Sequence, residues 1–257
     1  ATQDILSLFL VDATTAPTIR DFTGRRITSD RYVYVLHLSG SNGFVTVDGL
    51  LAHHLTGGAV SGQVYGIKCR NRSAEISNVL VYGMSASSAR GIYKEGTGAD
   101  PVTSDTTITN CTVLGGVYGI GVIAVQVAGT VTVQNCISVG ATWEFIACAG
   151  CVTTSKNNCA ALGNWHANFP NGATDLSTDP LFKDAANDDY SLSLASPCLD
   201  TGMWPSGRSS DILGQHAPSG PRMDRGCYEY QQDNPRSVRT RVTIPPTVPT
   251  RDERWMR

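Results

Sequence analysis

The stretch of sequence that decides the fold is Ile108-Thr109-Asn110-Cys111-Thr112-Val113-Leu114-Gly115, a β-rich run with Asn near its centre and Gly at its end. Related copies occupy residues 76–83, 133–140 and 157–163. The Asn residues that we align in the four copies are separated by 32, 25 and 23 residues: Asn78, Asn110, Asn135 and Asn158. A period of about 20–50 residues with short alternating strands is typical of a solenoid.

A second phrase, built around a Gly-Ile pair, alternates with the first. It occupies residues 64–69, 89–94 and 117–122, and a degenerate copy occupies residues 143–148. Each repeat thus contains two or three short strands joined by polar turns, and no predicted helix separates them, which disfavours a βαβ sheet. The pattern predicts an all-β protein folded as a parallel β-helix.

The repeated Asn and Cys have structural roles in such a coil. Asn tolerates the left-handed conformation of a sharp corner, and stacked Asn amides can hydrogen-bond to one another. Asp48 stands where the later coils have Asn. We expect the Cys that follow the repeated Asn to form a column of buried free thiols, filling the core as small hydrophobes: Cys111, Cys136 and Cys159.

After Gly163 the repeat stops, and an ordered set of motifs follows. The motifs are Asp179-Pro180-Leu181-Phe182, Ser196-Pro197-Cys198-Leu199-Asp200-Thr201-Gly202, Asp211-Ile212-Leu213-Gly214 and Asp224-Arg225-Gly226-Cys227-Tyr228-Glu229-Tyr230. Together with the Asn coils, they resemble the right-handed parallel β-helix repeat proteins of the pectin-lyase-like fold. The resemblance implies a single-stranded right-handed β-helix with an irregular C-terminal cap. This family includes polysaccharide-processing enzymes, secreted surface proteins and components of phage particles.

Four segments are expected: an N-terminal capping segment over residues 1–30, coils over 31–163, the last coils and C-terminal cap over 164–230, and an extended arm over 231–257. The arm holds six Arg and four of the twelve Pro, a composition that favours extended structure. We expect the arm to dock onto a neighbouring subunit, because Arg pairs bidentately with carboxylates and Trp255-Met256 can anchor in an apolar pocket.

Charge and hydropathy limit the partners. Residues 1–230 hold 14 Lys and Arg against 19 Asp and Glu, so the body offers no basic surface for nucleic acid. No apolar run approaches the ~18–20 residues that span a membrane. The apolar start over residues 5–11 is short and follows Asp4, which favours the absence of a signal peptide.

The other cysteines leave alternatives open. Cys148 and Cys151 have CxxC spacing, but no second such pair accompanies them, which disfavours a zinc or thioredoxin-like role. Whether they form a disulfide stays open. Cys198 and Cys227 stand where the family pattern has another small residue; they could pair, although buried free thiols are favoured.

The polar residues form no recognisable catalytic pattern. Asp is abundant beside Gly, Pro and Asn in the last third, where turn capping is favoured over a bound cation or catalysis: Asp179, Asp184, Asp188, Asp189, Asp200, Asp211 and Asp224. We interpret His53-His54 as a solvated turn. Trp143, Trp165 and His166 either pack over the core, which is favoured, or form a sugar-stacking platform. No catalytic, cofactor-binding or metal-binding residue is assigned.

These observations favour a non-enzymatic structural protein, expected in the virion of a tailed phage as a capsid decoration, cement or spike component. Its expected partners are other virion proteins or neighbouring subunits, with homo-oligomerisation, and a trimer among the possible states, implied by the family. A surface polysaccharide is a further candidate partner. Two alternatives stay open: a polysaccharide lyase or glycoside hydrolase acting as a depolymerase, and a secreted carbohydrate-binding or adhesive module.

Overall fold

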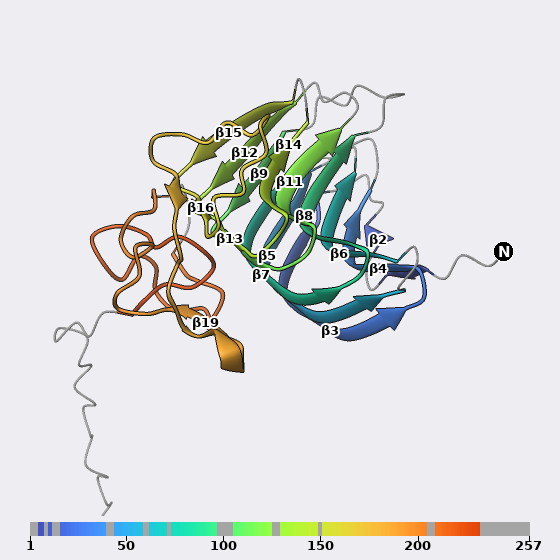
Figure 1. Cartoon of the computed structure of the whole chain (residues 1–257), viewed down its shortest axis with the longest axis horizontal. Helices are drawn as coiled ribbons and strands as arrows, with labels where there is room; N and C mark the ends of the chain where they lie inside the picture. The colour runs from blue at the N-terminus through green and yellow to red at the C-terminus, as the bar shows by residue number, and fades with distance from the viewer. Residues whose placement is uncertain are drawn as a thin grey trace, which may run out of the picture.

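The computed structural model describes residues 5–7, 10–11, 16–39, 44–58, 62–70, 73–96, 105–124, 129–148, 151–204 and 209–231. Within these ranges parallel strands stack into a β-solenoid, and the only helical element is the 3-10 turn η1 (Ala185–Asn187). The predicted all-β parallel coil is therefore confirmed (Figure 1). The arm that was expected to dock on a neighbour lies outside the described residues from residue 232 onward.

One sheet of seven strands forms the first wall of the solenoid. Its strands are, in spatial order, β1 (Ile5–Ser7), β4 (Tyr32–Leu38), β6 (Gln63–Arg70), β8 (Ser88–Gly96), β11 (Tyr118–Ala124) and β14 (Trp143–Ala147), with β2 (Leu10–Val11) also paired to β4. The second phrase of the sequence supplies β6, β8, β11 and β14. Equivalent residues stand in register, so Ile67 pairs with Ile92 and Ile92 with Ile120.

A sheet of ten strands forms the remaining walls. It contains β3 (Thr18–Ser29), β5 (Phe44–Gly57), β7 (Ser73–Ser85), β9 (Thr106–Thr109), β10 (Thr112–Leu114), β12 (Thr130–Gln134), β13 (Ile137–Val139), β15 (Val152–Lys156), β16 (Cys159–Ala160) and β17 (Leu176–Ser177). In the early coils this part of the chain forms one long bent strand (β3, β5 or β7). In the later coils the Asn corner separates it into two short strands, so that β7 pairs with both β9 and β10.

The Asn corners adopt the predicted left-handed conformation. The φ angles of Asn78, Asn110, Asn135 and Asn157 are 54°, 50°, 53° and 54°. Our alignment of the last copy was wrong by one residue, because Gln134 pairs with Lys156 and the corner therefore falls on Asn157. The alignment of Asp48 was also one residue off.

Gly49 is the residue at the corner equivalent to Asn78, since Asp48 pairs with Ser77 and Leu50 with Val79. Gly49 has a φ of 79°. Asp48 instead accepts hydrogen bonds from the side chains of Ser77 and Asn78, at 3.1 and 2.7 Å.

The one-residue shift also corrects the predicted cysteine column. Cys111 and Cys136 are buried in the main core and neither is in a disulfide, as predicted. Cys159 is free and buried too, but it pairs with Ile137 and belongs to a separate cluster outside the coil, against Cys198. Neither Cys198 nor Cys227 is in a disulfide, and they lie in different clusters, which confirms the favoured interpretation for this pair.

A row of glycines allows the two walls to approach closely. Gly66, Gly91 and Gly119 are the Gly of successive Gly-Ile pairs. A Cβ atom on Gly91 would lie 2.7 Å from the carbonyl oxygen of Gly119 and would overlap the Val113 side chain. A Cβ atom on Gly66 would meet the Gly91 carbonyl oxygen at 2.8 Å. The glycine of each Gly-Ile pair is therefore required because the neighbouring atoms leave no room for a side chain at this position of the coil.

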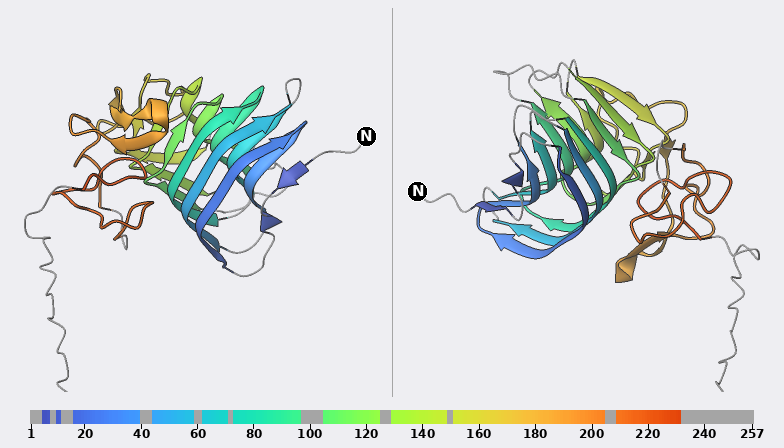
Figure 2. Two further views of the ribbon diagram at one scale, coloured as in Figure 1. Left: turned by 90° about the horizontal axis from the view of Figure 1, so that it is seen from below. Right: turned by 180° about the vertical axis from the view of Figure 1, so that it is seen from behind.

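The last third of the described chain covers one side of the solenoid (Figure 2). After β17 it forms the antiparallel pair β18 (Phe182–Asp184) and β19 (Asp189–Leu192), and irregular segments follow over residues 193–204 and 209–231. Tyr190 and Cys227 pack on Leu80 and Tyr82 of β7. Leu192 and Cys198 pack on Ile137 and Cys159 of β13 and β16. We call residues 178–231 the cap; most of its apolar contacts are with the outer surface of the coils.

Candidate functional site: the groove of the cap

Hydrogen bonds from the Asn corners hold the cap on the coils. The side-chain amide of Asn135 donates to the carbonyl oxygen of Met203 at 2.7 Å, and its Oδ1 accepts from the Met203 N–H at 2.7 Å. The amide of Asn157 donates to Thr201 O at 2.7 Å. Among the described residues, the predicted hydrogen bonds between stacked Asn amides are represented by one long contact of 3.4 Å, between Asn135 and Asn110. The main role of these amides is thus attachment of the cap.

The motif Asp224-Arg225-Gly226-Cys227 provides a second attachment. The Arg225 guanidinium is buried and donates to the carbonyl oxygen of Asn158 at 2.6 Å and to Thr201 Oγ1 at 2.9 Å. The N–H of Gly226, whose φ is 92°, donates to Asn135 O at 2.7 Å. Backbone groups of the coils thus find partners in the cap, as buried polar groups require.

Five Asp residues of the last third accept hydrogen bonds from groups two or three residues away, as the favoured turn-capping role requires: Asp179, Asp184, Asp188, Asp189 and Asp211. Asp200 and Asp224 instead accept from N–H groups 22 and 24 residues away in the chain, so they join separate segments of the cap. Asp211, for example, accepts from the N–H groups of Leu213 and Gln215 at 2.9 and 2.8 Å. Among the described residues no group of three or more His, Cys, Asp or Glu could hold a metal ion.

An open groove of about 770 Å³ lies in the cap between the β18–β19 pair and the last described segment. Its lining residues are Lys183, Asn187, Asp188, Asp189, Ser191, Leu192, Ser193, Leu194, Leu213, Gln215, Tyr228, Glu229, Tyr230 and Gln231. The volume is within the ~300–1,000 Å³ range of ligand pockets. A smaller pocket of about 200 Å³ shares Leu213 and Tyr228 with it and extends to Asp21 and Phe22 of the first coils.

The groove combines exposed apolar side chains with carboxylates. Leu194 and Leu213 are 76% and 63% exposed, high values for leucine. Asp188 is exposed, and Asp189 lies 3.7 Å from its single described cationic partner, Lys183. The groove therefore has an apolar and acidic surface. The sequence did not predict it, because the lining residues come from three segments far apart in the chain.

Two buried carboxyl groups lie in the last described segment of the cap, and one of them, Glu229, lines the groove. Glu229 accepts from the N–H groups of Ser219 and Asp224 at 2.9 and 3.1 Å. Asp224 accepts from the N–H groups of Asp200 and Tyr230, both at 2.7 Å. Burial raises the pKa of Asp224 to about 6, and burial together with the Asp224 charge raises the pKa of Glu229 to about 7.

These raised pKa values predict that the cap is most stable in mild acid. Ordinary values are 3.8 and 4.5, so between about pH 4 and 7 the native state binds more protons than the unfolded state, and stability falls as pH rises. The two shifts predict that the free energy of unfolding drops by about 4 kcal/mol between pH 5 and pH 8. Urea denaturation at pH 5 and pH 8 measures the drop.

The control is the double variant Asp224→Asn/Glu229→Gln, in which the pH slope should largely disappear even though the overall stability is lower. His37 acts in the opposite sense: burial, followed by the charge of Lys68, lowers its pKa, so its contribution to stability rises with pH. Because His37 is present in both proteins, the difference between their slopes isolates the carboxyl pair. Equal slopes in the two proteins would contradict the prediction.

A tyrosine cluster covers the outer face of the seven-stranded sheet. Tyr34, Tyr65 and Tyr93 are buried, with Tyr32 and Tyr118 packed against them. The Arg90 guanidinium lies over the rings of Tyr65, Tyr93 and Tyr118 at 5.0, 4.8 and 5.5 Å, and its Nη1 donates to the Tyr65 hydroxyl. The signal of this cluster in the sequence is the Tyr or Arg that precedes each Gly-Ile pair: Tyr65, Arg90 and Tyr118.

A second cation belongs to the same cluster. Lys68 Nζ lies over the rings of Tyr65 and Tyr34 at 4.9 and 5.5 Å and pairs with Glu95 at 3.0 Å. Burial raises the pKa of Tyr34 to about 12, so this hydroxyl is protonated at neutral pH. Mutual stacking and cation–π contacts explain the cluster as a stabilising layer between successive coils.

The two tryptophans that the sequence offered for a sugar-stacking platform, Trp143 and Trp165, have different surroundings in the structure. Trp165 stacks on Phe145 at 4.7 Å and packs near Phe169, so it closes the end of the core, as favoured. Trp143 instead is 37% exposed and forms an edge contact with His166. These side chains do not form one shared platform.

The histidine pair lies at a second corner of the coils. His54 is exposed with a φ of 54°, which agrees with the solvated turn. His53 is only half-buried and stacks on Tyr82 at 5.0 Å. Tyr82 in turn contacts Tyr190 of the cap. The pair thus borders the cap's aromatic contact.

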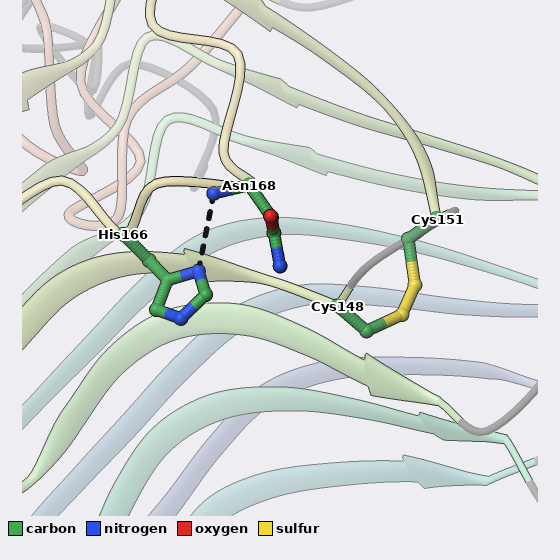
Figure 3. The surroundings of a disulfide bond; sticks show 4 residues. All are labelled: Cys148, Cys151, His166 and Asn168. Atoms are coloured by element: carbon green, nitrogen blue, oxygen red, sulfur yellow. Dashed lines mark hydrogen bonds between the residues drawn. A yellow bond between two sulfur atoms is a disulfide. The ribbon is translucent and has the colours of Figure 1, made fainter.

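Cys148 and Cys151 are joined by a disulfide, which answers the question that the CxxC spacing left open. Their Cα atoms are 5.4 Å apart, within the usual range for a bridge. The bridge links the end of β14 to the start of β15, and Figure 3 shows it with the turn residues His166 and Asn168 in its surroundings. The N–H of Asn168 donates to His166 Nδ1 at 3.2 Å.

Within the part of the chain that the structure describes, no helix is long and apolar enough to cross a membrane. No protein-family model matches the chain, and neither the curated proteins nor the solved structures include a significant match to it.

Proposed function

We propose that the protein is a non-enzymatic structural component of a particle, held to neighbouring subunits through its C-terminal arm. The expected setting is the virion of a tailed phage, with the protein serving as a capsid decoration, cement or spike. The observation that carries the proposal is the apolar and acidic groove of the cap. It lies open at the point where the arm begins, because Gln231 itself lines it.

The construction of the body supports a mechanical role. Stacked parallel strands pair the backbone along both sheets, and the cap is held to the coils by the Asn135, Asn157 and Arg225 hydrogen bonds. A body of this kind presents its surface groove in one fixed position. Such preorganisation lowers the cost of binding a partner.

A second candidate function, binding or cleavage of a polysaccharide, has one specific observation in its favour. Trp143 is exposed and stands in register with the Tyr118 and Arg90 positions of the tyrosine cluster. Exposed aromatic rings stack on the apolar faces of sugars, and a neighbouring cation favours acidic ones. The secreted adhesive module expected as a third option would use the same face.

The experiment follows the size of the purified full-length chain by sedimentation velocity over a wide concentration range. We expect oligomers in the native protein and a shift of at least tenfold in their concentration dependence when the six arm arginines are replaced by glutamine. The same preparation is incubated with acidic and neutral polysaccharides. A native protein that stays monomeric at all concentrations, or that releases new sugar chain ends, would overturn the structural proposal.

A further inference from the structure

We propose that the groove of the cap is the receptor for the arm of a second copy of this chain. The inference rests on the proposed function and names its partner: the Pro-rich segment over residues 242–249 and its flanking arginines. Three properties of the described groove support it: its apolar surface, its charge and its position at the base of the arm.

The apolar surface of the groove matches the composition of the arm. Tyr228 and Tyr230 line the groove beside the exposed Leu194 and Leu213. Grooves lined by aromatic rings are a recurrent way of binding Pro-rich segments, whose extended conformation costs little entropy to fix. The segment Val242-Thr243-Ile244-Pro245-Pro246-Thr247-Val248-Pro249 offers Val, Ile and Pro side chains for such a surface.

The charges of the groove and the arm are opposite. Asp188 and Asp189 line the groove with Lys183 as the only cation among its described lining residues, and Asp21 adds a carboxylate in the adjoining pocket. Residues 232–257 hold six Arg and three acids. Arginines flank the Pro-rich segment on both sides, at Arg241 and Arg251, where they can pair with carboxylates at the rim.

The position of the arm favours a second copy as its donor. The arm starts at the groove itself, so to enter the same groove the chain would have to reverse within residues 232–241. That reversal would have to be completed within ten residues, one of which, Pro235, has a fixed φ. An exchange of arms between two copies lets each groove receive an arm without a reversal, and the contacts are then reciprocal.

The test uses the full-length chain with lysine placed on the groove. Leu194→Lys and Leu213→Lys change exposed side chains, so folding should persist, and each adds a charge that repels the arginines. The probe is a fluorescent peptide of residues 236–257, titrated into each protein and read by anisotropy. We expect the double variant to bind it at least tenfold more weakly than the native chain.

The matched control is Leu162→Lys, which makes the same change at a leucine that is 67% exposed but lies outside the groove. Its affinity for the peptide should stay within twofold of the native value. Equal loss in the control and the double variant, or no loss in either, would overturn the groove as the receptor.

A second measurement separates this inference from the proposed function. A photo-reactive residue at position 248 is introduced into an equal mixture of light and heavy isotope-labelled chains, and the cross-linked peptides are sequenced. Cross-links from position 248 to residues 183–194 or 213–231 in mixed-isotope pairs support exchange between copies. Cross-links found only within one chain overturn it, whereas arm-dependent oligomers with unaffected groove variants overturn the receptor site and leave the proposed function standing.

Discussion

Gly91→Ala is expected to lower the free energy of unfolding by about 3 kcal/mol or more and to reduce the yield of soluble protein. The added methyl group would overlap the Val113 side chain and lie 2.7 Å from the Gly119 carbonyl oxygen. That oxygen belongs to the backbone of the next coil, which is held by strand pairing between β8 and β11. A flexible side chain could turn away, but a paired backbone segment cannot do so without breaking the ladder.

The control for this substitution is Gly140→Ala. Gly140 has a φ of 73°, and a Cβ atom there would have no neighbour within 4 Å. Its replacement should therefore cost only the left-handed backbone penalty of about 1 kcal/mol. Urea denaturation followed by circular dichroism compares the two variants. If Gly91→Ala were as mild as Gly140→Ala, the two walls of the coil would not be in the close contact that the structure shows.

The repeat could be predicted from the sequence because each copy needs particular residue types for local steric reasons. Asn at a left-handed corner and Gly at a close approach are both demanded by a few neighbouring atoms, so they recur visibly along the chain. The same local logic failed at Asn157-Asn158-Cys159, where two adjacent Asn residues fit the pattern equally well. Only the pairing of Lys156 with Gln134 decides which of them turns the chain.

The groove could not be predicted, for a physical reason. Leu194, Leu213 and Tyr228 lie in irregular segments with no periodicity, and their meeting depends on how the cap folds over the coils. The attachment of that cap was hidden as well. The left-handed corner favours Asn whatever its side chain contacts. An Asn that bonds to the next coil and an Asn that bonds to the cap therefore look the same in the sequence.

Asn135→Ala is the second substitution with a large expected effect, and it tests the attachment of the cap. It removes the amide that donates to Met203 O and accepts from the Met203 N–H, and it places Ala at a φ of 53°. Unmade hydrogen bonds of buried groups cost about 1–3 kcal/mol, and the left-handed backbone adds about 1 kcal/mol. We expect a total loss of about 3–4 kcal/mol in the free energy of unfolding.

Asn135→Gly separates the two contributions, because glycine adopts the left-handed conformation freely but has no amide. It should recover about 1 kcal/mol relative to alanine and leave the remaining loss in place. Hydrogen exchange then locates the damage. The N–H of Met203 should lose its protection in both variants, whereas the N–H of Gly226 bonds to the backbone oxygen of residue 135 and should keep part of its own. If the glycine variant restored full stability, the corner would need Asn only for its backbone conformation, and the cap would be held by its apolar contacts with β7, β13 and β16 together with the Arg225 hydrogen bonds.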